Sequence, residues 1–434
     1  MQLVKQNVRH FFNSTKWFSI ALVLLLFAIP ISNTLQAIAL GATVVLILLY
    51  YFNVTTASYL IAQPWVKGLI AFYFWVVLSC LWSHASQVEE LYVLDKYSKL
   101  LLLPILTLGF QDKRVRFWAI HAFLAAMLLT CILALAKAIH PVFFSNEIPG
   151  FVFRNYIMTG HMMALASYIA LSLAYSRNAF GNFDEQVTLN KSKQKQKQKQ
   201  ALLEFRLRQS ITNRGFYSLL FILFTFELLI LSIGRTGYVV YFLLIGLFLL
   251  QRLPSKQLLL GWAFMVGFGL VAYQLSPNIK EGLSQTYQNL VHYQQGDKDT
   301  SVGFRLQFQQ VALRLFYDKP LIGQGSGGFS SGFRQLDMVP GWGPTLQEPH
   351  NQYTLLLAEY GIVGMSLYGI LLFLLAYAFW QLKETRFLAF AVFIPFLIGC
   401  LSDSLLFYSA SGYFVLVFLA LCLGESLQPQ ALRK

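Results

Sequence analysis

The residues best suited to chemistry lie in one polar segment, residues 276–350, between long apolar stretches. The segment carries Arg305, Arg314 and Arg334, and it ends at His350, where the next apolar stretch begins. Guanidinium groups match phosphate oxygens through paired hydrogen bonds, and an imidazole titrates near neutral pH and can take a proton from a hydroxyl. Arginines beside such a base at a lipid surface predict chemistry on a lipid-linked anion.

His350 and its neighbour Asn351 leave two roles open. The imidazole can act as a general base, or it can only hydrogen-bond the substrate, with Asn351 contributing to binding. The chain has no HExxH motif, no Ser-His-Asp order and no paired carboxylates at a suitable spacing. Because few carboxylates are expected near these residues, we predict neither a divalent metal nor a cofactor.

A glycine-rich run, GQGSGG at Gly323–Gly328, invites comparison with a phosphate-binding loop. It lacks the Gly-Lys-Ser/Thr ending that such a loop uses to hold a nucleotide and its magnesium ion. We therefore reject a nucleotide site and expect either a turn or a backbone cradle for an anion.

The elements that must position these residues are membrane helices. Hydrophobic residues make up 56% of the chain and charged residues only 12%, with a mean hydropathy of +0.56. A soluble domain carries about twice that charged fraction. We predict an all-α, polytopic integral membrane protein in which residues 1–434 form a single domain.

Apolar runs of roughly 20 residues, long enough to cross a bilayer, predict about twelve spans. They are Trp17–Asn33, Leu35–Phe52, Trp65–Trp82, Tyr92–Phe110, Phe117–Ile139, Ile157–Ser176, Phe216–Ile233, Arg235–Leu250, Leu258–Leu275, Asn351–Trp380, Phe387–Ser402 and Leu405–Gly424. The fourth contains Lys96 and Lys99, whose charge is costly in lipid, so both must face a wet cavity or the interface.

Positive charge indicates the orientation of these spans. Lys and Arg gather in alternate loops, above all in the basic loop 177–214, whereas every short loop on the opposite side is nearly free of them except for Arg154 and Arg235. The positive-inside rule then places both termini and loop 177–214 in the cytoplasm, and loop 276–350 in the periplasm. Loop 177–214 can contact anionic membrane lipids.

The net charge of +14 therefore reflects membrane topology. Nucleic-acid binding is not expected, because no basic residues interleaved with aromatics form a soluble surface. The four cysteines lie in apolar spans without metal-ligand spacing, and we expect them to pack as small apolar residues.

Five cations are predicted to meet on the outer face: Lys96, Lys99, Arg154, Arg235 and Arg305. Ionisable groups at such depth commonly mark the path of a ligand. Apolar residues recur at helical spacing over Phe304–Phe316, which predicts an amphipathic helix at the outer membrane surface that ends at Asp318-Lys319-Pro320.

Several segments resemble the bacterial O-antigen ligase and polysaccharide polymerase superfamily. They are the DKPLIGQGSGGF, HNQY and AEYGIVG motifs within Arg305–Gly364, LSIGRTGYVVY at Leu231–Tyr241 and DSLLFYSASGYFVLVFLALCLG at Asp403–Gly424. LDKYSKLLLLP at Leu94–Pro104 is similar to the ligase branch, although Tyr97 stands where many ligases have proline.

The resemblance implies an O-antigen ligase of lipopolysaccharide biosynthesis in the bacterial inner membrane. Such a glycosyltransferase moves a polysaccharide from undecaprenyl diphosphate to a sugar hydroxyl of lipid A-core on the periplasmic face, without a metal and with inversion. Outside the cytoplasm no nucleotide sugar is available, so the donor must carry its own leaving group, and arginines can stabilise a departing diphosphate.

The resemblance also implies roles for single residues. Arg235 and Arg305 are expected to hold the diphosphate, and His350 to act as the base or to orient the acceptor. Lys96 and Lys99 match basic positions of the ligase branch, and Arg154 adds a further cation on topological grounds.

Two alternatives to a ligase stay open. A polymerase of the same superfamily would join repeat units on the same carrier. A flippase or another transporter of lipid-linked oligosaccharides would place cations throughout the membrane depth, whereas here they are predicted at the outer face.

Overall fold

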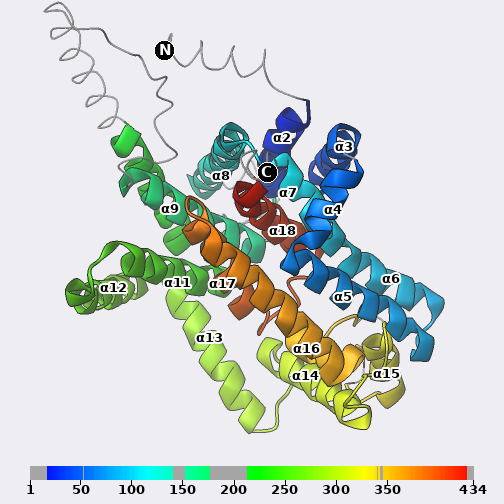
Figure 1. Ribbon diagram of the computed structural model, residues 1–434. Helices are drawn as coiled ribbons and strands as arrows, with labels where there is room; N and C mark the ends of the chain where they lie inside the picture. Colours follow the sequence, from blue (N-terminus) through cyan, green and yellow to red (C-terminus); the bar gives the residue numbers. More distant parts are fainter. Residues whose placement is uncertain are drawn as a thin grey trace, which may run out of the picture. The chain divides into compact units, whose positions relative to one another are not determined.

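The computed structural model of the chain describes residues 17–51, 53–139, 152–175, 213–339, 341–342 and 346–427 (Figure 1). Throughout these residues the regular elements are helices, which confirms the predicted all-α class. Residues 177–212 of the predicted basic loop lie outside the described residues.

Eight described helices are long and apolar enough to cross a membrane. They are α3 (Asn33–Tyr51), α5 (Pro64–Leu78) extended by η1 (Ser79–Trp82), α8 (Lys113–Ile139), α9 (Tyr156–Tyr175), the helix over Asn213–Leu231, α12 (Ser255–Leu275), α16 (Gln352–Gln381), and α18 (Ser409–Leu423) extended by η5 (Gly424–Leu427). Two shorter apolar helices are α2 (Trp17–Ile31) and α17 (Arg386–Gly399). A polytopic membrane protein is thus confirmed, while the number of about twelve spans stays a prediction.

The predicted span Tyr92–Phe110 is divided in the structure. It consists of α6 (Gln87–Ser98), a 3₁₀ turn η2 (Lys99–Leu101) and α7 (Leu102–Gly109). Ser86 caps α6 by accepting a hydrogen bond from the Glu89 backbone N–H, and the Glu89 carboxylate accepts one from the Ser86 N–H in return. Such a reciprocal cap fixes the start of a helix, so α6 begins five residues before the predicted span.

The helices form two compact units. The first comprises Met1–Ala122 and Glu281–Lys434, where α5 packs along α16 and α18 packs against α7 and α17. The second comprises Phe123–Lys280, where α9 packs against α11 (Arg235–Arg252). Helices α9 and α11 approach closely because glycines face each other where they meet. A Cβ added to Gly160 would lie 3.1 Å from the Gly237 Cα.

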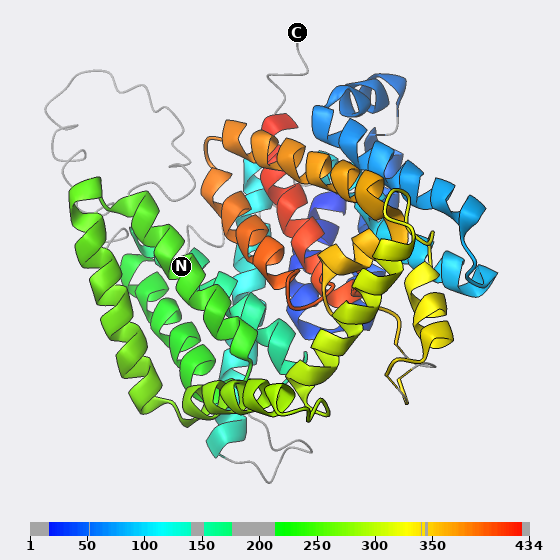
Figure 2. The same ribbon diagram turned by 90° about the horizontal axis from the view of Figure 1, so that it is seen from below.

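The polar segment 276–350 forms three helices, α13 (Pro277–Gln294), α14 (Ser301–Asp318) and α15 (Gly328–Leu336). The helix predicted over Phe304–Phe316 is confirmed as α14, and it ends at Asp318 as predicted. Its apolar face is buried and packs against α15 and α16, so this face contributes to the protein core. Figures 1 and 2 show α14 and α15 beside the beginning of α16.

Helix α16 is interrupted at Gly361, which has φ 62° and ψ −164°. Residues 320–325 lie along this break and pair with residues 358–363 through four backbone hydrogen bonds of 2.8 to 3.1 Å. These bonds satisfy peptide groups that the broken helix leaves without helical partners, which is a requirement for irregular backbone inside a membrane protein. The interruption therefore anchors the loop between α14 and α15.

Candidate functional site

The glycine-rich run Gly323–Gly328 lies in the loop between α14 and α15 and anchors that loop to the break in α16. A Cβ added to Gly323 would lie 2.4 Å from the Glu359 carbonyl carbon, so only glycine allows the contact. The Ser326 N–H donates to Ser79 Oγ at 3.1 Å, the Gly327 N–H donates to Glu359 Oε1 at 3.1 Å, and the other four N–H groups donate to backbone carbonyls. Because all six donors are engaged, the run forms a turn and offers no backbone cradle to an anion.

Arg334 at the end of α15 is held by the carboxylate of Glu89, at 2.6 Å. Glu89 also accepts hydrogen bonds from Ser330 Oγ at 2.9 Å and from Ser86. Burial alone would raise the pKa of Glu89, but these hydrogen bonds outweigh it and lower that pKa below its ordinary value. Arg334 is thus committed to joining α15 to α6.

His350 occupies a strained backbone position directly before α16. Its φ of 54° lies in the left-handed region, which non-glycine residues adopt at a cost of about 1–3 kcal/mol. The neighbouring contacts hold it there: the His350 N–H donates to Glu348 Oε2 at 2.7 Å, and the Asn351 side chain accepts from the Tyr353 and Thr354 N–H groups.

The imidazole of His350 lies between two carboxylates. Its Nδ1 is 3.0 Å from Glu348 Oε1 and 3.2 Å from Asp403 Oδ1. Tyr408 Oη donates to the same Glu348 oxygen at 2.6 Å, and the Ser404 N–H donates to Asp403 at 3.0 Å. We call His350, Glu348, Asp403 and Tyr408 the His350 cluster.

The electrostatics of the cluster favour a protonated imidazole. Burial opposes the charge, but the hydrogen bond with Asp403 and the charges of Glu348 and Asp403 prevail and raise the pKa of His350 above its ordinary value. With Nδ1 directed at carboxylates, Nε2 is the nitrogen that could meet a substrate, and it hydrogen-bonds none of the described residues. The side chain is 25% exposed, so a substrate can reach it.

Among the arginines of segment 276–350, Arg305 is the one whose charge acts on His350 and whose guanidinium has no ion-pair or hydrogen-bond partner among the described residues. Arg314 pairs with Asp318 at 3.7 Å and Arg334 with Glu89, whereas Arg305 makes no ion pair or hydrogen bond among the described residues. Its charge is close enough to act on the pKa of His350, which it lowers. An anion bound by Arg305 would therefore lie within electrostatic reach of the imidazole.

Asn351 and the two lysines of the fourth predicted span are engaged in the fold. Asn351 caps α16, and its Nδ2 donates to Gln309 Oε1 on α14 at 3.4 Å. The ammonium of Lys96 lies 4.5 Å from the Tyr92 ring centroid and 4.0 Å from Asp95. Lys99 is only 2% exposed and donates to two backbone carbonyls. The substrate-binding roles expected for these three residues stay predictions.

Arg154 and Arg235 belong to the second unit and are described within it. Arg235 is the first residue of α11, after Gly234, where a Cβ would lie 2.8 Å from the Tyr156 carbonyl oxygen. Arg154 is 6% exposed and lies two residues before the start of α9. Both thus stand at helix beginnings that meet near Tyr156. The diphosphate-binding role of Arg235 and the substrate-binding role of Arg154 stay predictions.

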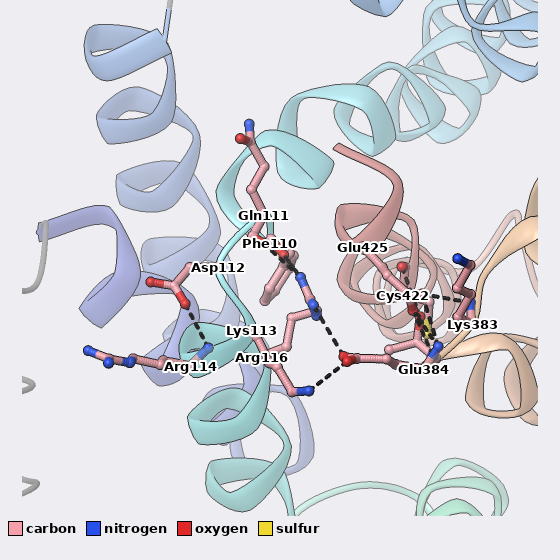
Figure 3. Close-up of polar contacts among 11 residues, drawn as sticks. Phe110, Gln111, Asp112, Lys113, Arg114, Arg116, Lys383, Glu384, Cys422 and Glu425 are labelled. Atoms are coloured by element: carbon pink, nitrogen blue, oxygen red, sulfur yellow. Dashed lines mark hydrogen bonds and ion pairs between the residues drawn. The ribbon is translucent and has the colours of Figure 1, made fainter. Parts of the chain in front are cut away.

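A second cluster of charges in the first unit lies beyond the other end of α16 (Figure 3). The buried Arg116 donates to the Phe110 and Gln111 carbonyls at 2.7 and 2.9 Å and lies 3.8 Å from Glu384. Lys113 pairs with Glu384 at 2.6 Å. Glu425 accepts hydrogen bonds from the backbone N–H groups of residues 383–385. We call Arg116, Lys113, Glu384 and Glu425 the Arg116 cluster.

Glu348, Asp403 and Tyr408 were missed in the sequence. Asp403 is 53 positions from His350, and the pairing depends on how α17 returns the chain to the start of α16. A signal in the sequence was that Asp403 begins the segment Asp403–Gly424, which resembles the O-antigen ligase and polymerase superfamily. The ligand atoms of Glu348, His350 and Asp403 lie within 4.8 Å of one another, so their types also suit a cation. The two carboxylate contacts of His350 Nδ1 compete with that use, because a metal would have to displace its proton.

In a comparison with known protein families, residues 219–369 match the O-antigen ligase family. The matched stretch includes Arg235, Arg305 and His350. This match confirms the resemblance to the O-antigen ligase superfamily and locates it in residues 219–369. No curated protein gives a significant match to the chain.

Proposed function

Starting from the O-antigen ligase domain at residues 219–369, we propose that the chain is a glycosyltransferase that moves a glycan from undecaprenyl diphosphate to a sugar hydroxyl of lipid A-core. In this proposal the reaction takes place at the periplasmic face of the bacterial inner membrane. The observation that carries it is the imidazole of His350, held by two carboxylates within reach of the charge of Arg305.

The proposed role of Arg305 follows from the chemistry of the leaving group. When the bond between the anomeric carbon and the diphosphate breaks, its electron pair stays on the diphosphate oxygen as negative charge. A preorganised guanidinium stabilises that charge more in the transition state than in the bound donor, and this difference is what accelerates a reaction. Arg235 is assigned the same role on the strength of its position in the matched family stretch.

The proposed role of His350 follows from its two nitrogens. Nδ1 faces Glu348 and Asp403, so the neutral ring would carry its proton there and leave Nε2 as acceptor. Nε2 would then take the proton of the acceptor hydroxyl while the hydroxyl oxygen bonds to the anomeric carbon and the diphosphate leaves from the opposite face. The carboxylates favour the imidazolium that results, which lowers the cost of the proton transfer.

A polymerase of the same superfamily remains the second candidate, because the family match does not separate the two activities. The same His350 cluster would serve both, and the acceptor would differ: lipid A-core in one case, a second carrier-linked glycan in the other.

The test is a reconstituted reaction with the purified chain, an undecaprenyl-diphosphate-linked glycan and lipid A-core. We expect a glycan–lipid A-core product and free undecaprenyl diphosphate from the wild type, and neither from His350→Gln. Longer carrier-linked glycan in the absence of lipid A-core would identify a polymerase instead. Intact donor under both conditions would overturn the proposed activity.

A further inference from the structure

Lys99 is a buried cation in the first unit that the proposed chemistry does not use directly. It is 2% exposed, and it forms no ion pair among the described residues. Burial of an ammonium group is costly unless its donors are satisfied. Its Nζ donates to the Phe407 and Tyr408 carbonyls, both at 3.2 Å, and lies 5.4 Å from the Tyr413 ring centroid.

Those carbonyls belong to the turn formed by residues 403–408, which carries half of the His350 cluster. Asp403 begins the turn and contacts His350 Nδ1 at 3.2 Å, and Tyr408 ends it and donates to Glu348 at 2.6 Å. The Lys99 ammonium therefore binds the backbone of Tyr408, the residue whose hydroxyl donates to Glu348.

The position of Lys99 also argues against a role in helix stability. The two carbonyls directly precede α18, and a positive charge near a helix N-terminus is unfavourable. Neither burial nor the helix dipole favours a lysine here. What the lysine contributes is a fixed geometry of the turn, through two hydrogen bonds that an apolar side chain cannot make.

We propose that Lys99 is a positioning residue that fixes the 403–408 turn and thereby holds Asp403 and Tyr408 against His350 and Glu348. This inference rests on the proposed role of His350. It differs from a substrate contact in what it predicts: loss of Lys99 should disturb the base and its chemistry, not the affinity for the diphosphate donor.

The first test compares Lys99→Met with wild type in steady-state transfer. Residues that orient a reacting group without contacting the substrate typically contribute about 10–100-fold to activity, so the kcat of Lys99→Met should fall by that factor. The KM for the donor should stay within about twofold of wild type, because no substrate contact is lost. Lys99→Arg should recover part of kcat, since a guanidinium can again donate to both carbonyls. Lys67→Met is the control, because Lys67 is an exposed lysine of α5.

The second test needs no activity. The rate at which diethyl pyrocarbonate modifies His350, followed by peptide mass spectrometry against pH, reports the protonation of the ring in an environment of Glu348, Asp403, Tyr408 and Arg305. In Lys99→Met the midpoint should move to lower pH than in wild type, because Asp403 is no longer held against Nδ1. Lys67→Met should leave it unchanged.

Gly412→Ala provides a variant that keeps the lysine, should Lys99→Met fold poorly. A Cβ at Gly412 would lie 2.9 Å from Lys99 Cδ and 3.0 Å from both Lys99 Nζ and the Leu406 carbonyl oxygen of the turn. It should therefore separate the ammonium from the turn and reproduce both effects. A raised donor KM with unchanged kcat in Lys99→Met would make Lys99 a substrate contact and overturn the proposal. An unchanged His350 midpoint in both variants would also overturn it, whereas an inactive wild type would count against the proposed function alone.

Discussion

The two ends of α16 carry clusters of similar composition and different character. The His350 cluster at its start places an imidazole beside two carboxylates, and the Arg116 cluster beyond its end places Arg116 and Lys113 beside Glu384. The Arg116 side chain is 0% exposed and its guanidinium is committed to the Phe110 and Gln111 carbonyls, whereas the His350 side chain is 25% exposed and keeps Nε2 uncommitted.

The difference shows which features separate a reactive site from a structural one. Both clusters join segments that are far apart in the sequence, so long-range pairing alone does not indicate function. A guanidinium keeps its proton at any physiological pH, while an imidazole between carboxylates can exchange one. Strained backbone is a second difference, because His350 has a positive φ.

The largest effect on activity is expected at His350. His350→Ala removes the proposed base and should reduce transfer by about 10²–10⁴-fold, as measured with purified donor and acceptor. The thermal melt of the protein should change little, because the side chain is partly exposed. Activity within threefold of wild type would remove His350 from the chemistry.

Arg116→Met should have the opposite profile. Removing one partner of a buried charge cluster typically costs about 3–5 kcal/mol of stability, because the remaining groups lose their partner. The thermal melt of the purified protein should fall, with the exposed Arg114→Met as control. The kcat of the folded fraction should equal that of wild type. A loss of kcat without a lower melting temperature would contradict a purely structural role for the Arg116 cluster.

Arg305→Ala should cost transition-state stabilisation with little loss of stability. By analogy with the loss of one oxyanion donor, kcat should fall by about 10²–10³-fold. Arg305→Lys should recover only part of this, since a point charge replaces a bidentate fork. Arg314→Ala, which removes an exposed ion pair with Asp318, should be nearly neutral. Equal losses in Arg305→Ala and Arg314→Ala would point to a general charge effect.

The smallest effect is expected from removing metal ions. The donor types of the His350 cluster suit a cation, but Nδ1 of His350 already contacts two carboxylates. Transfer should therefore stay within twofold after treatment with EDTA. Loss of activity that added magnesium or manganese restores would assign the cluster to a metal.

Sequence reasoning succeeded where local pattern determines structure. The presence and the end of α14 follow from apolar spacing and from the Asp318-Lys319-Pro320 stop, although the helix begins three residues before the predicted Phe304. Arg305 and His350 stand in motifs that can be recognised along the chain. The anchor role of Gly323–Gly328 could not be predicted, because it depends on a break in α16 whose free peptide groups pair with that loop.

The partners of the cations could not be predicted either. Lys99 donates to two backbone carbonyls, and such partners cannot be recognised in a sequence. Its predicted role as a substrate contact rested on its charge and topology, and it stays a prediction. Asp403 meets His350 only because α17 and the following turn return the chain to the start of α16. The sequence shows the type and charge of each residue, whereas the fold determines which charged groups already have a hydrogen-bond or ion-pair partner.

The central claim is that His350 is a base whose proton affinity is set by Asp403, and the pH dependence of kcat/KM tests it most directly. Because the base must be neutral and its pKa is raised, wild-type activity should fall as pH decreases through a value above about 6.5, the ordinary value for histidine. In Asp403→Asn, which loses the charge that raises this pKa, the acid limb should move to lower pH. A wild-type profile that is flat from pH 5 to 8, or an acid limb that Asp403→Asn leaves in place, would contradict the account.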